Sequence, residues 1–532
     1  MEPPSPSPFP PLEIPPVDLW TLLFERSDRP FPPSHPVFVD ALSGRSLSFQ
    51  QVRQQALHFG QALQTQWNWQ PGDVLMVFAP NAIEVPPVVW GTLAVGGTVC
   101  PVNPSYRADE LVHPLTDARA RAIVTTTAQA PVVYEAVDRV GLSRDRVILL
   151  DQPSPSWVRG EAAPIAAHTP PVRHPDQELA FLVYSSGTTG LPKGVMLSHR
   201  NMVANLLQNA AVDKSQMTWE HDRALGVLPF FHIYGITYLL NYTVYSGVPL
   251  YVLPRYQFAP FCDTIQRHRI TYAYAVPPVI LELVSNPGTL QYDLSSLRLI
   301  VSAAAPLAVE LIHRARHQLR LPVRQAYGMS ECAPCTHLQT WPEAISHPGS
   351  VGRLIPNMTA KFAPIEGETG RSKELWVKGP NVFLGYLNNP QANAESFDDG
   401  YYKTGDVGYA DDQGHFYLTD RLKELIKYNG FQVAPAELEA IALGHPAVAD
   451  VAVTGVPSGQ AGTELPQAYV VLAKGHAADA KTADAIVEFV GDKVIGYKKL
   501  RGGVHFVPSI PRNPSGKILR RELKRLQREA KL

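Results

Sequence analysis

Short apolar runs alternate with amphipathic segments along most of the chain. Residues 74–78 and 181–184 are continuous apolar runs with the length of a buried strand, whereas residues 47–67 contain apolar side chains at helical spacing. Similar segments follow one another up to a Pro-, Ser- and Ala-rich stretch at 151–177 and resume after it. This alternation predicts an α/β fold whose sheets are mostly parallel.

The pattern changes near residue 420. Residues 435–443 predict a short helix that begins at a proline, and residues 448–454 and 468–472 predict strands. Together with a helix predicted at 482–494, they form a compact α+β unit of ordinary domain size. We therefore expect a disordered, proline-rich leader at 1–16, a large multilayer N-terminal domain at 17–420 and a small C-terminal domain at 421–532.

Composition narrows the class of protein. The chain has 47 Lys and Arg against 48 Asp and Glu, a balance that gives no reason to expect a nucleic-acid partner. No apolar run reaches about 18 residues, so we expect no membrane span. Four cysteines argue against a disulfide framework, and Cys332 and Cys335 have no second pair with which to complete a zinc site.

A Gly-, Ser- and Thr-rich loop at 184–194 ends in a lysine and lies between two apolar runs. Such a loop offers backbone N–H groups and hydroxyls to phosphate oxygens, and Lys193 adds a positive charge. The Walker pattern fails because Pro192 and Gly194 flank that lysine, and the dinucleotide fingerprint is absent. The alternative is a flexible surface loop, but flexible linkers rarely separate two apolar runs.

Other candidates for chemistry follow the predicted strands. His232 stands among aromatic residues in 229–235, although an isolated histidine among apolar residues is more often part of the core. Small residues at 302–307 would let a flat ligand approach the backbone. Tyr327 offers a stacking face and Glu331 a hard oxygen ligand. Taken singly, Glu331 could instead be a helix N-terminal acid, just as Asp406 could be a turn residue and Lys423 and Lys427 one solvated face.

Taken together and in this order, these motifs resemble the adenylate-forming (acyl-CoA synthetase) superfamily, and within it the 4-coumarate–CoA ligase and luciferase-like branch. The resemblance covers nearly the whole chain past the leader. Its strongest parts are the loop at 184–194, the stretch at 420–439 and the motif at 514–517. It implies a small C-terminal domain that is mobile, and a reaction in which ATP activates a carboxylic acid as acyl-AMP before coenzyme A accepts the acyl group.

The resemblance implies a role for each matching position. Lys517 would bridge carboxylate and phosphate, Glu331 would hold Mg²⁺, and His232 would lie near the acyl carboxylate as a catalytic residue. The ATP- and AMP-binding residues would be Ser185, Ser186, Gly187, Thr188, Thr189, Gly190, Lys193, Ala304, Ala305, Pro306, Tyr327, Gly328, Ser330, Asp406 and Arg421. The acyl pocket would contain His232, Tyr234, Ala303, Ala326 and Ala333.

For the second step the resemblance implies a swing of the small domain about Lys423. Lys427 and Gln432 would act near the active site, Lys427 as a catalytic residue. Arg255, Asn429 and Gly430 would contact coenzyme A. Three positions depart from the usual pattern: Ala326 replaces a glycine, which should narrow the pocket, Asn429 replaces a common lysine, and Ser330 replaces a threonine.

Several alternatives stay open. The acid could be an arylpropenoic acid, another aromatic acid or a medium-chain fatty acid. The chain could instead load a carrier protein, oxidise an acyl-adenylate as luciferase does, or sense a nucleotide without turnover. Residues 530–532 read Ala-Lys-Leu, which resembles a peroxisomal address recognised by an import receptor. The plainer interpretation is an ordinary helical tail on a cytoplasmic protein.

Overall fold

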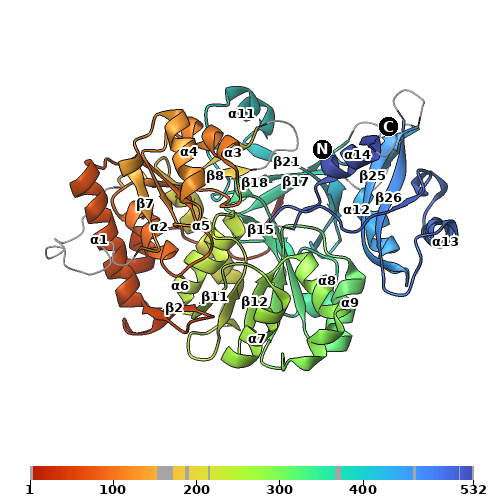
Figure 1. Ribbon diagram of the computed structural model, residues 1–532, viewed down its shortest axis with the longest axis horizontal. Coiled ribbons are helices and arrows are strands. Elements are labelled where there is room, and N and C mark those ends of the chain that lie inside the picture. Colours follow the sequence, from red (N-terminus) through yellow and green to blue (C-terminus); the bar gives the residue numbers. More distant parts are fainter. Residues whose placement is uncertain are drawn as a thin grey trace.

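The chain forms a large body and a smaller C-terminal lobe, drawn in blue at one end of the molecule (Figure 1). The computed structural model describes residues 4–152, 172–185, 191–213, 216–365, 373–429, 431–458, 463–514 and 516–529. Two mostly parallel sheets and one antiparallel sheet build the large body. The predicted α/β class, with mostly parallel sheets in the large domain, is therefore confirmed.

The seven-stranded sheet has the order β19-β9-β8-β5-β4-β6-β7. Its strands are β4 Val74–Phe78, β5 Thr98–Pro101, β6 Ala122–Thr125, β7 Val147–Leu149, β8 Leu179–Ser185, β9 Lys193–Ser198 and β19 Gly385–Tyr386. Strands β4 to β8 run parallel, whereas β9 pairs antiparallel with β8, so that Ser185 is opposite Lys193. The phosphate-loop motif thus connects two strands of a hairpin.

The nine-stranded sheet has the order β16-β15-β14-β13-β12-β10-β11-β2-β3. Its strands are β2 Pro36–Asp40, β3 Ser46–Ser48, β10 Ala224–Gly226, β11 Leu250–Val252, β12 Tyr272–Ala275, β13 Leu299–Ser302, β14 Val323–Gly328, β15 Cys335–Leu338 and β16 Arg353–Leu354. Its central strands are parallel, and β13 and β14 end where two of the predicted nucleotide motifs begin.

Helices cover these two sheets, and their ends follow local sequence signals. The helix α1 begins with a capping box between Ser48 and Gln51 and packs on α2, where Gly60 and Gly91 let the two backbones approach closely. The helices are α1 Phe49–Trp67, α2 Val85–Ala94, α3 Ala108–Asp117, α4 Ala130–Val140, α5 His199–Asp213, α6 Thr243–Ser246, α7 Phe258–His268, α8 Pro277–Ser285, α9 Val309–Leu319, α10 Glu343–Ser346 and α11 Pro390–Ser396. A π-helix, η4, spans Gly235–Tyr242.

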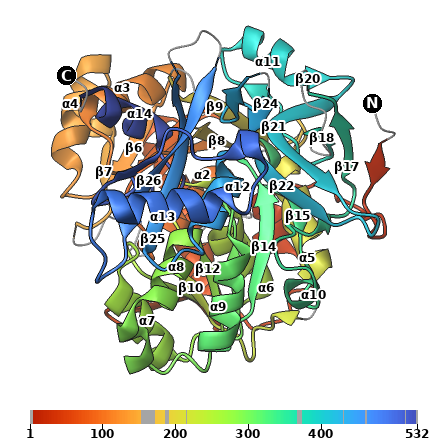
Figure 2. The same cartoon turned by 90° about the vertical axis from the view of Figure 1, so that its right-hand side faces the viewer.

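An antiparallel sheet completes the large body. Its strands are β1 Ser5–Pro6, β17 Thr359–Ala363, β18 Lys373–Lys378, β20 Phe397–Asp398, β21 Tyr401–Ala410 and β22 Phe416–Arg421. The small domain follows directly and lies across one end of the large body (Figure 2). It contains β23 Ile426–Tyr428, β24 Phe431–Val433, β25 Val448–Pro457, β26 Glu464–Leu472, β27 Val504–Phe506, α12 Pro435–Ala442, α13 Ala480–Gly491 and α14 Arg520–Glu529. The predicted boundary after residue 420 stays a prediction.

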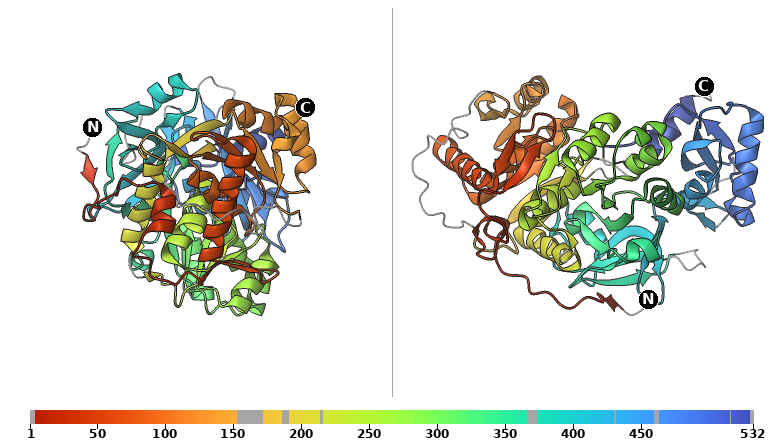
Figure 3. Two further views of the ribbon diagram at one scale, coloured as in Figure 1. Left: turned by 90° about the vertical axis from the view of Figure 1, so that its left-hand side faces the viewer. Right: turned by 90° about the horizontal axis from the view of Figure 1, so that it is seen from below.

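The leader differs from its prediction. Residues 4–16 run along the outside of the large body (Figure 3), and Ser5–Pro6 pair with β17. Asn357 fixes the segment further on, because its side chain accepts the Leu12 N–H at 2.8 Å and donates to the Leu12 carbonyl at 2.6 Å. The prediction of disorder is therefore wrong for residues 4–16. Within the part of the chain that the structure describes, no helix has both the length and the apolar character needed to cross a bilayer.

Candidate active site

A cavity of about 800 Å³ lies between the two domains. The large body contributes most of its wall, and the small domain closes it with residues around 512–519. Fourteen of the residues predicted from the sequence line this cavity: Ser185, Lys193, His232, Tyr234, Ala303, Ala304, Ala326, Tyr327, Gly328, Ser330, Glu331, Arg421, Lys423 and Lys517. Motifs more than 300 residues apart in the sequence therefore meet in one space.

Tyr327, Asp406 and Arg421 form a hydrogen-bonded group at one side of the cavity. The Tyr327 hydroxyl donates to Asp406 Oδ2 at 2.5 Å, and Arg421 Nε lies 2.9 Å from Asp406 Oδ1. The Asp406 carboxylate raises the pKa of the Arg421 guanidinium, which stays cationic. Asp406 is only 5% exposed. Tyr327 and Arg421 line the cavity and present an aromatic face and a cation, whereas Asp406 does not line it and holds both of them in place.

The backbone beside this group approaches the cavity closely. Ala304 lines the cavity with a φ of 74°, in the left-handed region. A Cβ at Gly328 would lie 2.0 Å from the Pro334 carbonyl oxygen, so only glycine fits there. Ala305 is half-buried and Pro306 is exposed, and neither lines the cavity, although both were predicted to contact the adenine.

Lys193 and Glu331 both line the cavity, and both contact Tyr386. The Lys193 Nζ lies 4.7 Å from the centre of the Tyr386 ring, and the Tyr386 hydroxyl donates to Glu331 Oε1 at 2.9 Å. Sequence reasoning missed Tyr386, because its only signal was an aromatic residue after a glycine outside any motif. The cavity-lining carboxylate of Glu331 fits Mg²⁺, which binds few protein carboxylates together with substrate phosphates. Residues 186–190, predicted to bind phosphate, lie outside the described residues.

His232 also lines the cavity and is half-buried. Burial, with a smaller contribution from Lys517, lowers the pKa of His232 to about 4, so the ring is neutral at physiological pH. The Tyr234 N–H donates to Nδ1 at 3.3 Å, which leaves the proton of the neutral ring on Nε2. His232 is therefore a neutral hydrogen-bond donor.

Apolar and aromatic side chains surround His232. Tyr234, Ala303 and Ala326 line this part of the cavity, as do Tyr238 and Met329, which the sequence did not single out. Ala333 was predicted to line the pocket, but it is fully buried outside the lining, where its carbonyl accepts the Thr237 hydroxyl at 2.8 Å.

Lys517 reaches the cavity from the small domain. The Asn513 side chain accepts its backbone N–H at 2.9 Å, and the Asn513 N–H donates to the Lys517 carbonyl, which fixes the turn. The pKa of Lys517 is lowered to about 8, mainly by burial and next by the charge of Arg421. The carboxylates of Asp406, Glu331 and Glu424 act in the opposite direction. Lys517 is thus a half-buried amine that titrates near physiological pH.

The residues predicted for the second step lie elsewhere. Lys427 and Asn429 are exposed on the small domain, and neither they nor Gln432 lines the cavity. Arg255 is also exposed and away from it, and Gly430 is outside the described residues. Lys423, the predicted hinge, does line the cavity. The arrangement seen here therefore presents the Lys517 side of the small domain and not the Lys427 side.

Comparison with known proteins agrees with this fold and site. A family model described as an AMP-binding enzyme matches residues 24–387, and one described as its C-terminal domain matches 437–517. Probable 4-coumarate–CoA ligase 1 of Dictyostelium discoideum is 39% identical over 86% of both chains. 4-Coumarate–CoA ligase-like 1 of Arabidopsis thaliana is also 39% identical, over 92% of this chain and 90% of that protein.

Solved structures give the same result. ATP-bound MatB from Rhodopseudomonas palustris matches with a TM-score of 0.84 and 27% identity over 96% of this chain and 98% of that one. o-Succinylbenzoate CoA synthetase from Bacillus subtilis, in complex with its acyl-adenylate, matches with a TM-score of 0.80 and 26% identity over the same shares.

The fold and the cavity define an adenylate-forming enzyme. The chain belongs to the AMP-binding enzyme family, with both its main and its C-terminal domain. The predicted family and the predicted class, an AMP-forming acid–CoA ligase, are confirmed at this level.

Proposed function

We propose that this enzyme joins an aromatic or medium-length apolar carboxylic acid to coenzyme A. In the first step the carboxylate attacks the α-phosphorus of ATP, which forms acyl-AMP and releases pyrophosphate. In the second step the thiol of coenzyme A attacks the acyl carbon and releases AMP. The observation that carries the proposal is that Lys517 of the small domain enters the cavity that is lined by Tyr327, Arg421 and His232, with Asp406 bonded to the first two.

The first step brings two anions together, so the site must neutralise charge. Lys193 and Lys517 are the cations we assign to this task, Lys193 toward the outer phosphates and Lys517 between the carboxylate and the α-phosphate. Mg²⁺ held by Glu331 would supply further neutralisation of the phosphates when bound. Tyr327 would stack on the adenine, while Asp406 would accept hydrogen bonds from the ribose hydroxyls.

The acid would occupy the apolar part of the cavity around His232. A neutral imidazole with its proton on Nε2 can donate one hydrogen bond to a carboxylate oxygen without the cost of burying a second charge. The surrounding Tyr234, Tyr238 and Met329 favour an apolar acyl group. The names of the plant and Dictyostelium relatives support an arylpropenoic acid within this class.

The second step needs a path for the thiol, and Lys517 and its turn close one side of the cavity. We propose that the small domain turns after the first step, near Lys423, and presents the side that carries Lys427 and Asn429. Because AMP is a good leaving group, no nucleophile of the enzyme is required.

The test is acid-dependent pyrophosphate release, measured with ATP, Mg²⁺ and a panel of cinnamic, phenylacetic, benzoic and medium-chain fatty acids, with and without coenzyme A. We expect release with one acid class and a thioester product only when coenzyme A is present. Lys517→Ala serves as the matched control and should lose acyl-AMP formation while it still forms thioester from supplied acyl-AMP. Release without any thioester product would point to a carrier protein as acceptor, and no release with any acid would contradict the proposal.

We also propose import into peroxisomes through residues 530–532, which lie outside the described residues. The support is the resemblance of Ala-Lys-Leu to a known C-terminal address. A fluorescent protein that ends in the last twelve residues should become punctate in cells. If it stays diffuse, the proposal of import fails and a cytoplasmic location remains.

A further inference from the structure

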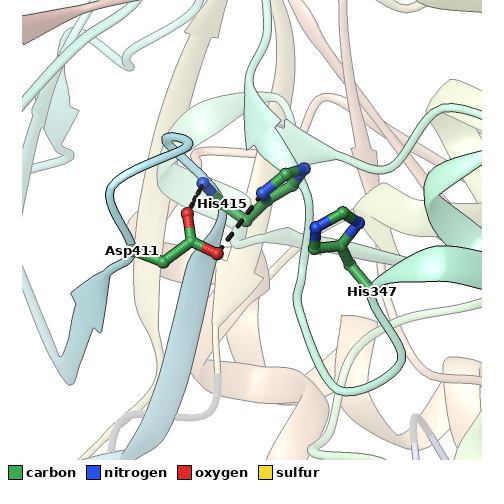
Figure 4. Close-up of side chains that lie close together, drawn as sticks. All are labelled: His347, Asp411 and His415. Carbon is green, nitrogen blue, oxygen red and sulfur yellow. Dashed lines mark hydrogen bonds and ion pairs between the residues drawn. The ribbon is translucent and has the colours of Figure 1, made fainter.

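A cluster of metal-binding side chains lies outside the cavity, on the large body. His347 follows α10, and Asp411 and His415 flank the turn between β21 and β22 (Figure 4). One ligand atom from each of the three lies within 4.8 Å of the other two. The cluster joins the turn of the antiparallel sheet to the segment that precedes β16 of the nine-stranded sheet.

The most buried member of the cluster lacks a hydrogen bond at one nitrogen. His415 is 1% exposed, and its Nδ1 has no hydrogen-bond partner. The nearest carboxylate oxygen is Asp411 Oδ2, at 3.4 Å. Two ligands of one tetrahedral Zn²⁺ ion lie about 3.3–3.4 Å apart when each bond is about 2.0–2.1 Å long. The pair is therefore spaced for a shared ion and too far apart for a good hydrogen bond.

Glu343 orients the His415 ring so that the lone pair of Nδ1 is available to an ion. Its Oε1 lies 3.2 Å from His415 Nε2, which favours the tautomer with the proton on Nε2. Arg353 Nε lies farther from the same nitrogen, at 3.4 Å, and the Arg353 guanidinium is paired with Glu343 at 2.6 Å. The Nδ1 lone pair then faces the Asp411 carboxylate, and two acceptors can face each other only with a cation or a proton between them. A carboxylate behind a histidine in this way is common around bound zinc.

His347 closes the cluster on its outer side. Its ring lies over that of His415 with the ring centres 3.7 Å apart and the planes at 20°. The terminal torsion of a histidine has a broad potential, so a small turn of this half-buried ring directs a nitrogen at an ion between Asp411 and His415. Two imidazoles and one carboxylate are a ligand set for Zn²⁺ and not for Mg²⁺.

We propose that His347, Asp411 and His415 form a binding site for a divalent transition-metal ion, for which Zn²⁺ is the best fit. Water would complete the tetrahedral coordination. The ion would fasten the β21–β22 turn to the segment after α10. This site is separate from the Mg²⁺ position assigned to Glu331, and it does not depend on the proposed acid.

The experiment is calorimetric titration of ZnCl₂ into the full-length protein after treatment with a chelator, in excess MgCl₂ so that hard oxygen sites are occupied. The test variants are His347→Asn and Asp411→Asn. The matched control is His317→Gln, which removes an exposed histidine of α9 that could bind zinc adventitiously with His313. Visible absorption after addition of Co²⁺ reports tetrahedral coordination directly.

We expect one Zn²⁺ per chain in the unaltered protein and in His317→Gln, with at least a tenfold loss of affinity in both test variants. The Co²⁺ bands should disappear in His347→Asn, and Zn²⁺ should raise the melting temperature of the unaltered protein and of His317→Gln but of neither test variant. Equal binding by all four proteins would identify an adventitious ion only and overturn the proposal. The absence of binding would also overturn it.

Discussion

Lys517 and Arg421 set the charge of the cavity at the scale of single residues. Both are half-buried cations that line the cavity, and each is close to the carboxylates of Asp406 and Glu331. Arg421 keeps its proton because Asp406 pairs with it. Among the described residues no carboxylate forms an ion pair with Lys517, and its pKa falls to about 8, mainly through desolvation. The two therefore respond differently to pH.

The first prediction concerns pH. Lys517 must be protonated to lie between two anions, and its protonated fraction falls as the pH rises through about 8. We expect kcat/KM for pyrophosphate release, which reports the free enzyme, to be constant near pH 7 and to fall toward tenfold per pH unit above about 8. Lys517→Arg should abolish this alkaline fall, because arginine keeps its proton. A kcat/KM that stays constant up to pH 9.5 in the unsubstituted enzyme would contradict the prediction.

The second prediction concerns the width of the acid pocket. Ala326 lines the cavity from β14, and Ala326→Gly removes one methyl group from the wall. We expect acids with one additional small substituent to gain about tenfold in relative kcat/KM, since one methylene changes discrimination by about that factor. Ala273→Gly in β12 is the matched control, because Ala273 is buried in a strand but does not line the cavity. The same change in both variants would exclude a role for Ala326 in selection.

Single residues were predictable from sequence where they belong to a motif. Lys193, His232 and Lys517 were each singled out, and the structure places all three in one cavity. Tyr386 and Glu374 also line it, but each is isolated in the sequence and reaches the site only through pairing of distant strands. The prediction that Ala305 and Pro306 bind the nucleotide extended the motif too far, because the chain turns away from the cavity after Ala304.

Turns between elements fix where functional side chains point. The segment from Pro229 to Gly235 carries His232 between β10 and η4, and the Pro229 carbonyl accepts the His232 N–H at 3.1 Å. A Cβ at Gly235 would lie 2.1 Å from that same carbonyl oxygen. Glycine is therefore required for the turn that presents the imidazole.

The third prediction follows from this turn. Gly235→Ala forces the Pro229 carbonyl away and should displace His232, so we expect at least a tenfold lower kcat/KM for the acid and a lower melting temperature. Gly226→Ala is the matched control, since its Cβ would meet only the Leu250 side chain, at 3.1 Å or more, which can shift. Steady-state kinetics with the acid varied and thermal unfolding test this. Wild-type kinetics for the acid in Gly235→Ala would show that the turn does not position His232.

Elements with a strong local pattern were predictable, and those that depend on distant partners were not. The strand Val74–Phe78 was predicted with its observed bounds, and helices α1 and α12 were predicted within a few residues. The course of the leader was not predictable, because its two-residue strand pairs with β17 and its Leu12 is held by Asn357, both about 350 residues away. A proline-rich composition carries no sign of such a partner.

The relative position of the two domains is a property of the whole molecule, and no motif in the sequence indicates it. Gly516 of the small domain touches the start of α8, where a Cβ at Gly516 would lie 3.2 Å from Val276 Cβ. Disulfides join Cβ atoms about 3.5–4.5 Å apart. The contact therefore offers a place to fasten the arrangement that contains Lys517 in the cavity.

The fourth prediction uses that contact. The double variant Val276→Cys with Gly516→Cys should form a disulfide on oxidation, at the cost of a strained residue at a φ of 82°. We expect the oxidised protein to make acyl-AMP but to lose at least 90% of thioester formation, and a reductant to restore it. The four native cysteines are buried, so the reduced protein is its own control. Undiminished thioester formation by the oxidised protein would rule out the proposed turn of the small domain.

The proximity of Lys517 and Arg421 has a consequence for the whole cycle. Lys517 loses solvation when it enters the cavity and there faces the cationic Arg421, and the nearby carboxylates offset this cost only in part, so the arrangement is disfavoured until polyanionic ATP enters. By thermodynamic reciprocity, ATP favours this arrangement by the same factor by which the arrangement tightens ATP binding. Departure of pyrophosphate withdraws most of that negative charge. The chemistry of the first step would thereby release the small domain at the moment when the thiol needs room to enter.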